Sequence, residues 1–387
     1  MREGRFFRIP ECRSDLERLW YESDPLDPRD RPAWLDLGRA GRYRYAGSAA
    51  WPGSGGRGRD EYAAELRALR DAGLVVDPDP AAPGRHRVYV PAPPHEVVWA
   101  VGIYTGTFPD RFAPAPGVKN PVLTRGDVTD IPAAFLADPF MVRAGGCWHM
   151  FFEVMNGRTG LGEIGLAVSP DGLNWKYRQV VLAEPFHLSY PYVFEWRGAH
   201  YMVPETYQAR EVRLYEATDF PTRWRPVATL LGGPYLVDAS VFRHAGRWWM
   251  FADASRDVRH DTLRLFHAAE LAGPWAEHPR SPVVEGDPRT ARPGGRVVVG
   301  RDRVVRYAQA CVPHYGTAVR AFEVAELTPT TYAERELGPV LGPAGAGWNA
   351  CGMHHIDPHP LGDGRWLACV DGWVCEDLLP PPAPTNT

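Results

Sequence analysis

After residue 130 the chain repeats one pattern of hydrophobic and polar positions, with a period of about fifty residues. A polar or turn-forming residue opens a short alternating strand, Gly or Asp-Gly makes a turn, and an aromatic-rich strand follows that ends in a polar residue. Alternation with this punctuation is the signal of antiparallel hairpins. Three clear copies run 138–153, 190–205 and 238–253, and two degenerate copies run 292–309 and 355–371.

A second hairpin follows in each clear copy, because another alternating strand leads to a turn and then to an aromatic residue. Trp175, Trp224 and Trp275 hold this place in the first three copies, and Tyr332 replaces Trp in the fourth. Each copy therefore supplies roughly four antiparallel strands, and this period is typical of propeller blades. Five copies predict an all-β protein with a five-bladed β-propeller.

The fifth copy lacks its outer half, since the chain after Trp373 runs into a Pro-rich stretch. The one unassigned strand-like segment upstream is 97–104, and we expect it to complete the fifth blade. Pairing of the two ends of the repeat region removes the exposed edges of an open set of sheets. The alternative for this segment is a linker strand of the domain in front.

Three regions follow from this pattern: a small α+β N-terminal domain at 1–92, the propeller at 93–377, and a Pro-rich disordered tail at 378–387. In the first region we expect helices near 13–21 and over 61–72 and a strand at 86–89. A winged-helix-like module is one interpretation of this region. A small packing domain, or one that docks a protein partner, is the other.

Composition mainly excludes classes of function and partner. A net charge of −4 and a pI of 6.4, with no basic stripe, argue against a nucleic-acid partner. The sequence has neither a signal-peptide pattern nor an apolar run long enough to cross a bilayer, so we expect no membrane span and a cytoplasmic location. The six cysteines form no C-x-x-C pair, which predicts free thiols.

Candidate chemistry lies at the propeller axis, because the first strand of each blade is innermost and such folds place ligands there. The polar residues that open these strands are Asp138, Tyr190, Asp238, Arg292, His354 and His355. The polar residues that end the second strands are Glu153, Glu205, Asp253, Gln309 and Asp371. Converging carboxyl groups resist simultaneous ionisation, which separates a general acid from a general base. The alternative is that the opening Asp residues cap strands or bind backbone amides.

A metal site is an alternative at the fifth copy. His355, Asp357 and His359 alternate, and on a strand they would form a facial set of ligands. Pro358 and Pro360 interrupt the strand pattern, and no zincin-type spacing is present. We therefore predict no metal and no other cofactor, and we expect the histidines to contact substrate.

Several of these motifs together resemble one known family. They are Tyr190-Pro191-Tyr192, Pro204-Glu205-Thr206, Val237-Asp238-Ala239-Ser240, Gly273-Pro274-Trp275 and Met353-His354-His355. From about Trp99 to Trp373 the chain is similar to the propeller domain found at the N-terminus of glucosamine inositolphosphorylceramide transferases and in bacterial relatives. More distantly, the architecture resembles the five-bladed glycoside hydrolases of family 43.

The resemblance to family 43 implies catalytic roles for three carboxyl groups. An Asp on the first blade is the base there, a later Glu is the acid, and a further Asp tunes the acid; these roles match Asp138, Glu205 and Asp238. The order departs from the hydrolase pattern, because Glu205 closes the second blade and Asp238 opens the third. We expect a carbohydrate-active enzyme of hydrolase or glycosyl-transfer type. Its sugar or other small-molecule substrate would be bound by Glu153, Tyr190, Asp253, Arg292, Gln309, His354, His355 and Asp371.

Two other functions stay open at this point. In the plant transferases the resemblance assigns glycosyl transfer to a separate C-terminal domain, so this propeller could instead be a non-catalytic module that binds a glycan or a partner. Such a module would bind its ligand without turnover, and binding would be indifferent to Glu205→Gln. A tailoring enzyme or cyclase of natural-product biosynthesis could also reuse the axial acids.

Overall fold

The computed structural model describes residues 34–36, 42–50, 75–78, 85–91 and 97–375, apart from 234, 256–258, 313–314 and 363. The chain divides into two compact units, residues 1–97 and 98–387. In the first unit, four strands pair antiparallel in the order β1-β2-β4-β3; they are β1 (Trp34–Asp36), β2 (Arg42–Ala50), β3 (Val75–Pro78) and β4 (Arg85–Pro91). The strand expected at 86–89 lies within β4, whereas both expected helices and the expected tail lie outside the described residues.

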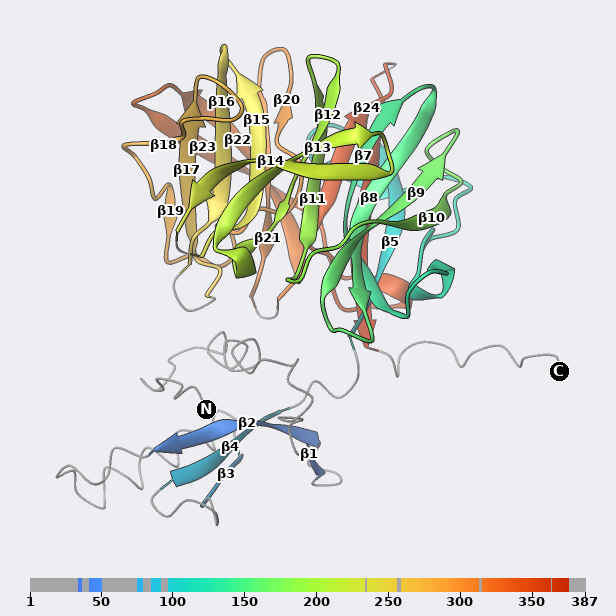
Figure 1. The fold of residues 1–387 in the computed structure, drawn as a ribbon, viewed down its shortest axis with the longest axis vertical. Coiled ribbons are helices and arrows are strands. Elements are labelled where there is room, and N and C mark those ends of the chain that lie inside the picture. The colour runs from blue at the N-terminus through green and yellow to red at the C-terminus, as the bar shows by residue number, and fades with distance from the viewer. Residues whose placement is uncertain are drawn as a thin grey trace. The chain divides into compact units, whose positions relative to one another are not determined.

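The second unit is a five-bladed β-propeller, as predicted (Figure 1). The first blade contains β7 (Ala133–Ala144), β8 (Cys147–Asn156), β9 (Gly162–Ser169) and β10 (Lys176–Leu182). The second contains β11 (Ser189–Trp196), β12 (Ala199–Glu205), β13 (Glu211–Asp219) and β14 (Arg223–Gly232). The third contains β15 (Val237–His244), β16 (Arg247–Asp253), β17 (Thr262–Ala268) and the short β18 (Ala276–Glu277) and β19 (Val284–Glu285). The fourth contains β20 (Val298–Val299), β21 (Val304–Ala310), β22 (Ala318–Leu327) and β23 (Tyr332–Leu341). The first strands of the first four blades contact one another in turn around the axis, and that of the fifth blade contacts that of the first.

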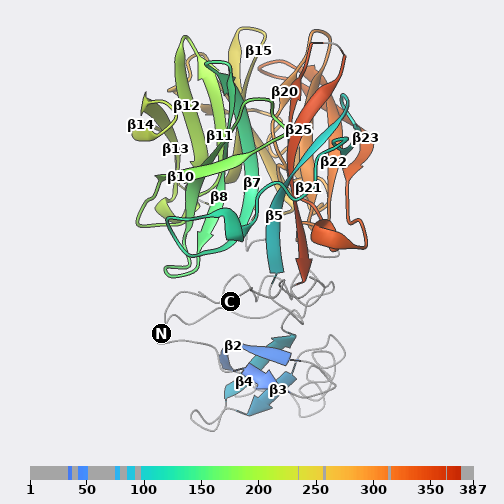
Figure 2. The same cartoon turned by 90° about the vertical axis from the view of Figure 1, so that its right-hand side faces the viewer.

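The fifth blade joins the two ends of this unit. β24 (Ile356–Pro360) and β25 (Trp366–Cys375) pair with β5 (Val97–Thr107) and β6 (Arg111–Pro114), in the order β24-β25-β5-β6. Figure 2 shows the cyan β5 beside the red β25. The expectation that segment 97–104 completes the last blade is confirmed, and the alternative of a linker strand is wrong.

Apolar side chains fill the spaces between the blades, since both faces of each sheet are covered. Phe140 and Phe151 of the first blade pack in one cluster with Met202 of the second. Val101 and Ile103 of the closing strand β5 pack in another cluster with first-blade residues. Ring closure is therefore held by buried apolar surface as well as by strand pairing. Among the described residues, no helix has the length and apolar character needed to cross a membrane.

The Trp residues that mark the second half of each repeat share one structural role. Trp175, Trp224 and Trp275 each donate the indole N–H to a backbone carbonyl three or four residues earlier, at 2.9 to 3.0 Å. Each indole therefore satisfies a carbonyl group in the turn before the fourth strand, where the ladder of the sheet supplies no donor.

The fourth blade departs from the repeat at its beginning. Arg292, which the pattern placed at the start of a strand, lies in an irregular segment ahead of β20. Gly295 in this segment forms a parallel bridge with Ile356 of the fifth blade. A Cβ atom at Gly295 would lie 1.8 Å from the Ile356 carbonyl oxygen, so only glycine permits this close approach of two backbones.

Arg296 closes the axis at this level. Its guanidinium forms an ion pair with Asp357 and donates to the Val193 carbonyl at 2.9 Å. It also lies over the rings of Phe140 and Tyr192, with its central carbon 5.6 and 5.0 Å from their centroids. Arg296 lies in the segment just ahead of the fourth blade, and its side chain contacts residues of the first, second and fifth blades. These contacts fill the axis around Arg296 with protein side chains.

Candidate active site

The first strands of the first three blades each contain a β-bulge at the polar residue that the sequence pattern singled out. Asp138, Tyr190 and Asp238 have left-handed backbones, with φ of 53°, 45° and 54°. Each lies where the register with the second strand shifts, as in a β-bulge. A left-handed residue other than glycine costs roughly 1–3 kcal/mol and is typical of functional sites, and bulges redirect side chains.

The acids that end the second strands lie next to these bulges. Glu153, Glu205 and Asp253 are each paired with the residue just before a left-handed residue. All three are buried, with exposed fractions of 5%, 5% and 0%. In each of the first three blades, the β-bulge therefore places the polar residue of the first strand beside the acid that ends the second strand.

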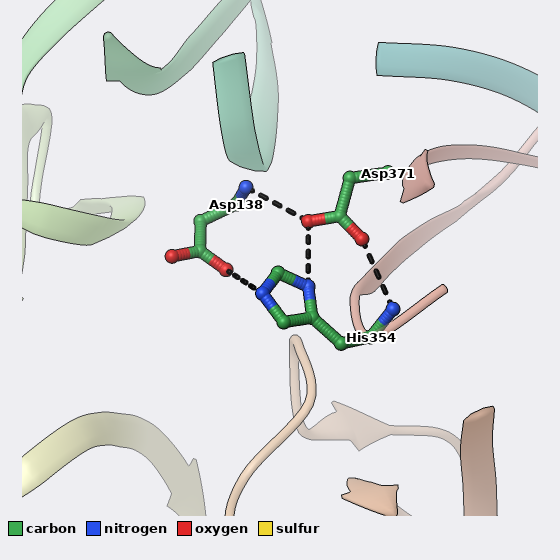
Figure 3. A group of neighbouring side chains, drawn as sticks. All are labelled: Asp138, His354 and Asp371. Carbon is green, nitrogen blue, oxygen red and sulfur yellow. Dashed lines mark hydrogen bonds and ion pairs between the residues drawn. The ribbon is translucent and has the colours of Figure 1, made fainter. Parts of the chain in front are cut away.

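Asp371 is the centre of the first cluster of polar side chains (Figure 3). Its Oδ1 accepts the backbone N–H groups of His354 and His355 at 3.1 and 3.0 Å, and its Oδ2 accepts that of Asp138 at 3.0 Å. The same Oδ2 lies 2.7 Å from Nδ1 of His354. Burial would raise the pKa of Asp371, but His354 and these donors bring it below its usual value.

His354 lies between Asp371 and Asp138, with Nε2 at 3.8 Å from Oδ1 of Asp138. Burial alone would lower the pKa of His354, but the two carboxyl groups raise it above its usual value. Burial raises the pKa of Asp138 to about 7, with His354 opposing the rise and Asp238 adding to it. Asp138 is thus tuned to exchange a proton near neutral pH.

Arg292 is the centre of the second cluster. Its Nε donates to Oδ2 of Asp238 at 2.6 Å, and Gln309 donates to the same oxygen at 3.0 Å. A second guanidinium N–H lies 3.0 Å from Nδ1 of His260, and a third nitrogen lies 3.7 Å from Oε2 of Glu205. The same Nδ1 lies 3.4 Å from Oδ2 of Asp253, so the His260 ring bridges Arg292 and Asp253.

Glu205 has the environment of a carboxyl group that keeps its proton. Its Oε2 is buried and has no hydrogen-bond partner within the described part of the chain. Burial raises the pKa of Glu205 well above its usual value; Asp238 raises it further, and Arg292 opposes the rise. A carboxyl group that stays protonated at neutral pH can serve as a general acid.

Glu153 has a partner that the sequence did not indicate. Nε2 of His187 lies 3.5 Å from Oε1 of Glu153, and Nδ1 of the same ring accepts the N–H of Gly162 at 2.9 Å. Burial lowers the pKa of His187 to about 4, so the ring is neutral at physiological pH and carries its proton on Nε2. Burial raises the pKa of Glu153 well above its usual value, and Asp138 adds to the rise.

The two clusters act on one another electrostatically. Asp238 of the second cluster raises the pKa of Asp138 in the first, and Asp138 in turn raises that of Glu205. Arg292 lowers the pKa of all three acids that are raised, which are Asp138, Glu153 and Glu205. The predicted acids of the two clusters are therefore electrostatically coupled.

Five of the predicted substrate-binding residues are at most 1% exposed: Tyr190, Asp253, Gln309, His355 and Asp371. The Tyr190 hydroxyl bonds to Ser240 and to the Gly295 backbone, and Asp253 accepts from Ser255. Nδ1 of His355 lies 3.7 Å from Asp138. In this structure these five side chains support other residues, and their contact with a substrate stays a prediction.

The alternative metal site at the fifth copy does not form. Asp357 is bound by Arg296 and His359, and His355 faces Asp138 instead. Among the described residues, the group with three ligand atoms within 4.8 Å of one another is Asp138, His354 and Asp371. Both oxygens of Asp371 already accept N–H donors, an arrangement that favours an imidazole–carboxylate pair over an open coordination site.

Sequence reasoning missed several residues around the two clusters: Trp99, His187, Tyr235, His260 and Tyr315. His187 and Tyr235 lie three residues before Tyr190 and Asp238, so the repeat register could have found them as polar aromatic residues at one fixed offset. His260 and Tyr315 lie in the loops after β16 and β21, where the strand pattern gives no signal.

Comparison with known proteins gives the family. Residues 92–373 match the family described as "Glucosamine inositolphosphorylceramide transferase 1, N-terminal". The chain is 35% identical over 302 residues to Glucosamine inositolphosphorylceramide transferase 1 of Oryza sativa subsp. japonica, and 31% identical over 300 residues to the Arabidopsis thaliana protein of that name. Each alignment covers 72% of this chain but only 40% or 39% of the relative, so the chain spans about two fifths of the length of these proteins.

A solved structure with the same fold is the β-1,2-mannobiose phosphorylase of Listeria innocua. It superposes with a TM-score of 0.53 at 13% identity, covering 70% of this chain and 96% of that protein. This likeness shows the propeller fold, and the sequence match shows more: the chain belongs to the family of the N-terminal region of glucosamine inositolphosphorylceramide transferase 1.

Proposed function

We propose that this propeller is a carbohydrate-active enzyme that breaks or transfers a glycosidic bond at its axis. The observation that carries the proposal is the pair Glu205 and Asp138, two buried carboxyl groups with raised pKa values, where Asp138 adds to the rise at Glu205. Glycoside chemistry needs one carboxyl group that holds a proton and one that takes a proton. The relatives are named as a glucosamine transferase, and the structural neighbour is a disaccharide phosphorylase, which supports a sugar substrate.

Glu205 is the general acid of the proposal. It gives its proton to the leaving oxygen, which is consistent with a pKa held high by burial and by Asp238. Arg292 and Gln309 fix the position of Asp238 beside it. This arrangement supports a tuning role for Asp238, since moving that carboxyl group would change how readily Glu205 releases its proton.

Asp138 is the base of the proposal. With a pKa of about 7, it can take the proton of an attacking hydroxyl group as that oxygen bonds to the anomeric carbon. The attacking group is water in hydrolysis and an acceptor hydroxyl, such as that of an inositol phosphate, in transfer.

The groups left to hold the sugar are Arg292 and His187. The His187 side chain is 17% exposed and presents an Nε2–H donor. The oxygens of the axial carboxyl groups can accept hydrogen bonds from an ammonium group. Glucosamine, the sugar in the name of the relatives, carries an amine that suits these acceptors.

The proposal is tested by incubating the purified chain with glycosides and nucleotide sugars of glucosamine and N-acetylglucosamine, with and without inositol phosphate, and following products by mass spectrometry. We expect turnover by the wild type and by the exposed control Glu285→Gln. Glu205→Gln and Asp138→Asn should each lower kcat by about 10²- to 10⁴-fold. A wild type that binds a sugar in calorimetry but converts none of these donors would refute it.

A glycan-binding module is the second candidate function. It is favoured by the share of the curated relatives that this chain spans, because the activity in their name can reside in the rest of those proteins. Sugar binding without turnover, with an affinity unchanged by Glu205→Gln, would favour this candidate over the first.

A further inference from the structure

Asp371 favours one tautomer of His354. Its Oδ2 lies 2.7 Å from Nδ1 of the ring as an ion pair, and because a carboxylate has no proton to donate, this contact favours a proton on Nδ1. In the neutral ring the lone pair is then on Nε2, which faces Oδ1 of Asp138 at 3.8 Å (Figure 3). The imidazole therefore presents a proton acceptor to the side chain of Asp138.

The same carboxylate fixes the backbone on both sides of this contact. Asp371 accepts the backbone N–H of His354 with one oxygen and that of Asp138 with the other. It has no exposed surface, so water does not compete for these bonds. Asp371 thus contacts both residues and fixes the position of Nε2 of His354 relative to the carboxyl group of Asp138.

Aromatic rings complete the environment of the imidazole. The ring of Trp99 stacks on that of His354, with centroids 4.0 Å apart and planes inclined by 26°. Tyr315 meets the same ring edge-on at 5.3 Å. Stacking on an indole face stabilises a cationic ring, so these contacts favour a state in which His354 carries a second proton.

We propose that Asp371, His354 and Asp138 form a proton relay, in which Nε2 of His354 receives the proton that Asp138 takes from the attacking hydroxyl group. The inference rests on the proposed role of Asp138 as base. As the attacking oxygen bonds to the anomeric carbon, its proton moves to Asp138 and from there to His354. This leaves an imidazolium between two carboxylates.

The proton count of the cycle balances. Glu205 gives its proton to the leaving oxygen as the old carbon–oxygen bond breaks, and His354 gains the proton of the attacking group. The imidazolium then releases its proton to solvent and Glu205 takes one up, which restores the starting state. No oxidant, reductant or metal enters the sequence.

The charged groups that face His354 suit this role. Asp371 from β25 and Asp138 from β7 favour the imidazolium, and Arg292 ahead of β20 opposes it. Tyr315 and the adjacent His355 are further titratable neighbours of the ring. The distance of 3.8 Å to Asp138 is longer than a hydrogen bond. Catalytic hydrogen bonds are often long without substrate and tighten when it binds.

The state of His354 can be followed without turnover. In the full chain labelled with ¹³C at histidine Cε1, the His354 signal is identified by its loss in His354→Gln and titrated by NMR. We expect its midpoint above the ordinary histidine range, and we expect Asp371→Asn to lower it by about one pH unit or more. Asp138→Asn should lower it too and serves if Asp371→Asn does not fold. An ordinary midpoint, or one that neither variant lowers, overturns the relay.

Kinetics separates the relay from the proposed function. His354→Gln keeps an amide where Nε2 stands but cannot take a proton, so kcat should fall by about 10- to 10²-fold with little change in KM. The acidic limb of the kcat profile should also shift, because Asp138 then titrates without the imidazole beside it. His244→Gln, far from the cluster in sequence and at the end of β15, is the control. Wild-type turnover that His354→Gln leaves unchanged refutes the relay alone, whereas no wild-type turnover refutes the proposed function.

Discussion

The acids at the axis are held in a state that works against folding at neutral pH. A carboxyl group whose pKa is raised in the folded protein binds its proton more tightly there than in the unfolded chain. Its stabilising contribution is therefore complete at low pH and is lost as pH rises through the folded pKa. For Asp138 this loss runs from about pH 4 to about pH 7. The pKa values of Glu153 and Glu205 are also raised, so these groups lose stabilisation in the same direction with pH. The site therefore contains buried carboxyl groups that destabilise the folded protein at neutral pH, which a purely structural core would not need.

Asp138→Asn is expected to stabilise the protein at pH 8 while it lowers kcat by about 10²- to 10⁴-fold. The amide removes a buried charge, and Asn tolerates the left-handed backbone that this position requires. We expect Tm to rise by roughly 2 °C or more at pH 8 and the gain to vanish near pH 4. Thermal unfolding from pH 4 to pH 8 measures this, with the exposed Asp302→Asn as control. A variant less stable than wild type at pH 8 would show that attraction to His354 outweighs the repulsion.

At the scale of elements, the repeat predicted the strands because every blade buries alternate side chains of its strands, which leaves the same hydrophobic pattern in each copy. The register also predicted which polar residues meet, since the bulges and the second-strand acids recur at equal spacing. Arg292 was misplaced because Gly294 and Gly295 let the backbone leave the sheet and approach the fifth blade closely. His187 and His260 lie in connections between strands, whose course depends on tertiary packing that no local pattern encodes.

The recurring indole groups allow a test of how equivalent the blades are. Replacing Trp175, Trp224 or Trp275 by Phe keeps the aromatic ring but leaves a turn carbonyl without its donor. Each change should lower the free energy of unfolding by about 1 kcal/mol, and the three values should be similar. Urea unfolding measures this. Losses that differ several-fold between the three would show that packing of the ring, not its N–H, decides the contribution of this position.

At the scale of the whole molecule, Arg296 and Asp357 tie together blades that lie far apart in the sequence. Burial would raise the pKa of Asp357, but Arg296 and His359 hold it well below its usual value. Asp357 also accepts the backbone N–H of Met141 in the first blade at 2.6 Å. Because both charges are buried, each depends on the other for its compensation.

Breaking this pair should be costly, and removing both partners less so. Arg296→Met and Asp357→Asn are each expected to lower the free energy of unfolding by about 3–5 kcal/mol, because each leaves the other group without its partner. The double variant should lose clearly less than the sum of the two. The more exposed pair Arg320 and Glu336 is the control, and Arg320→Met should cost no more than about 1 kcal/mol. Additive losses in the double variant would contradict the coupling.

The closure of the fifth blade also sets the order in which the protein can become functional as it is made. The ribosome completes β5 long before it reaches β24 and β25, so for most of translation the closing strand can pair with β6 but not with β25. During that time the nascent chain already carries Asp138, Glu205 and Asp238, while His354 and Asp371 are still missing. A chain released before β25 has emerged therefore holds four blades and an incomplete axis. The proposed chemistry uses residues of the first, second and last blades, so it can begin only once β25 is in place.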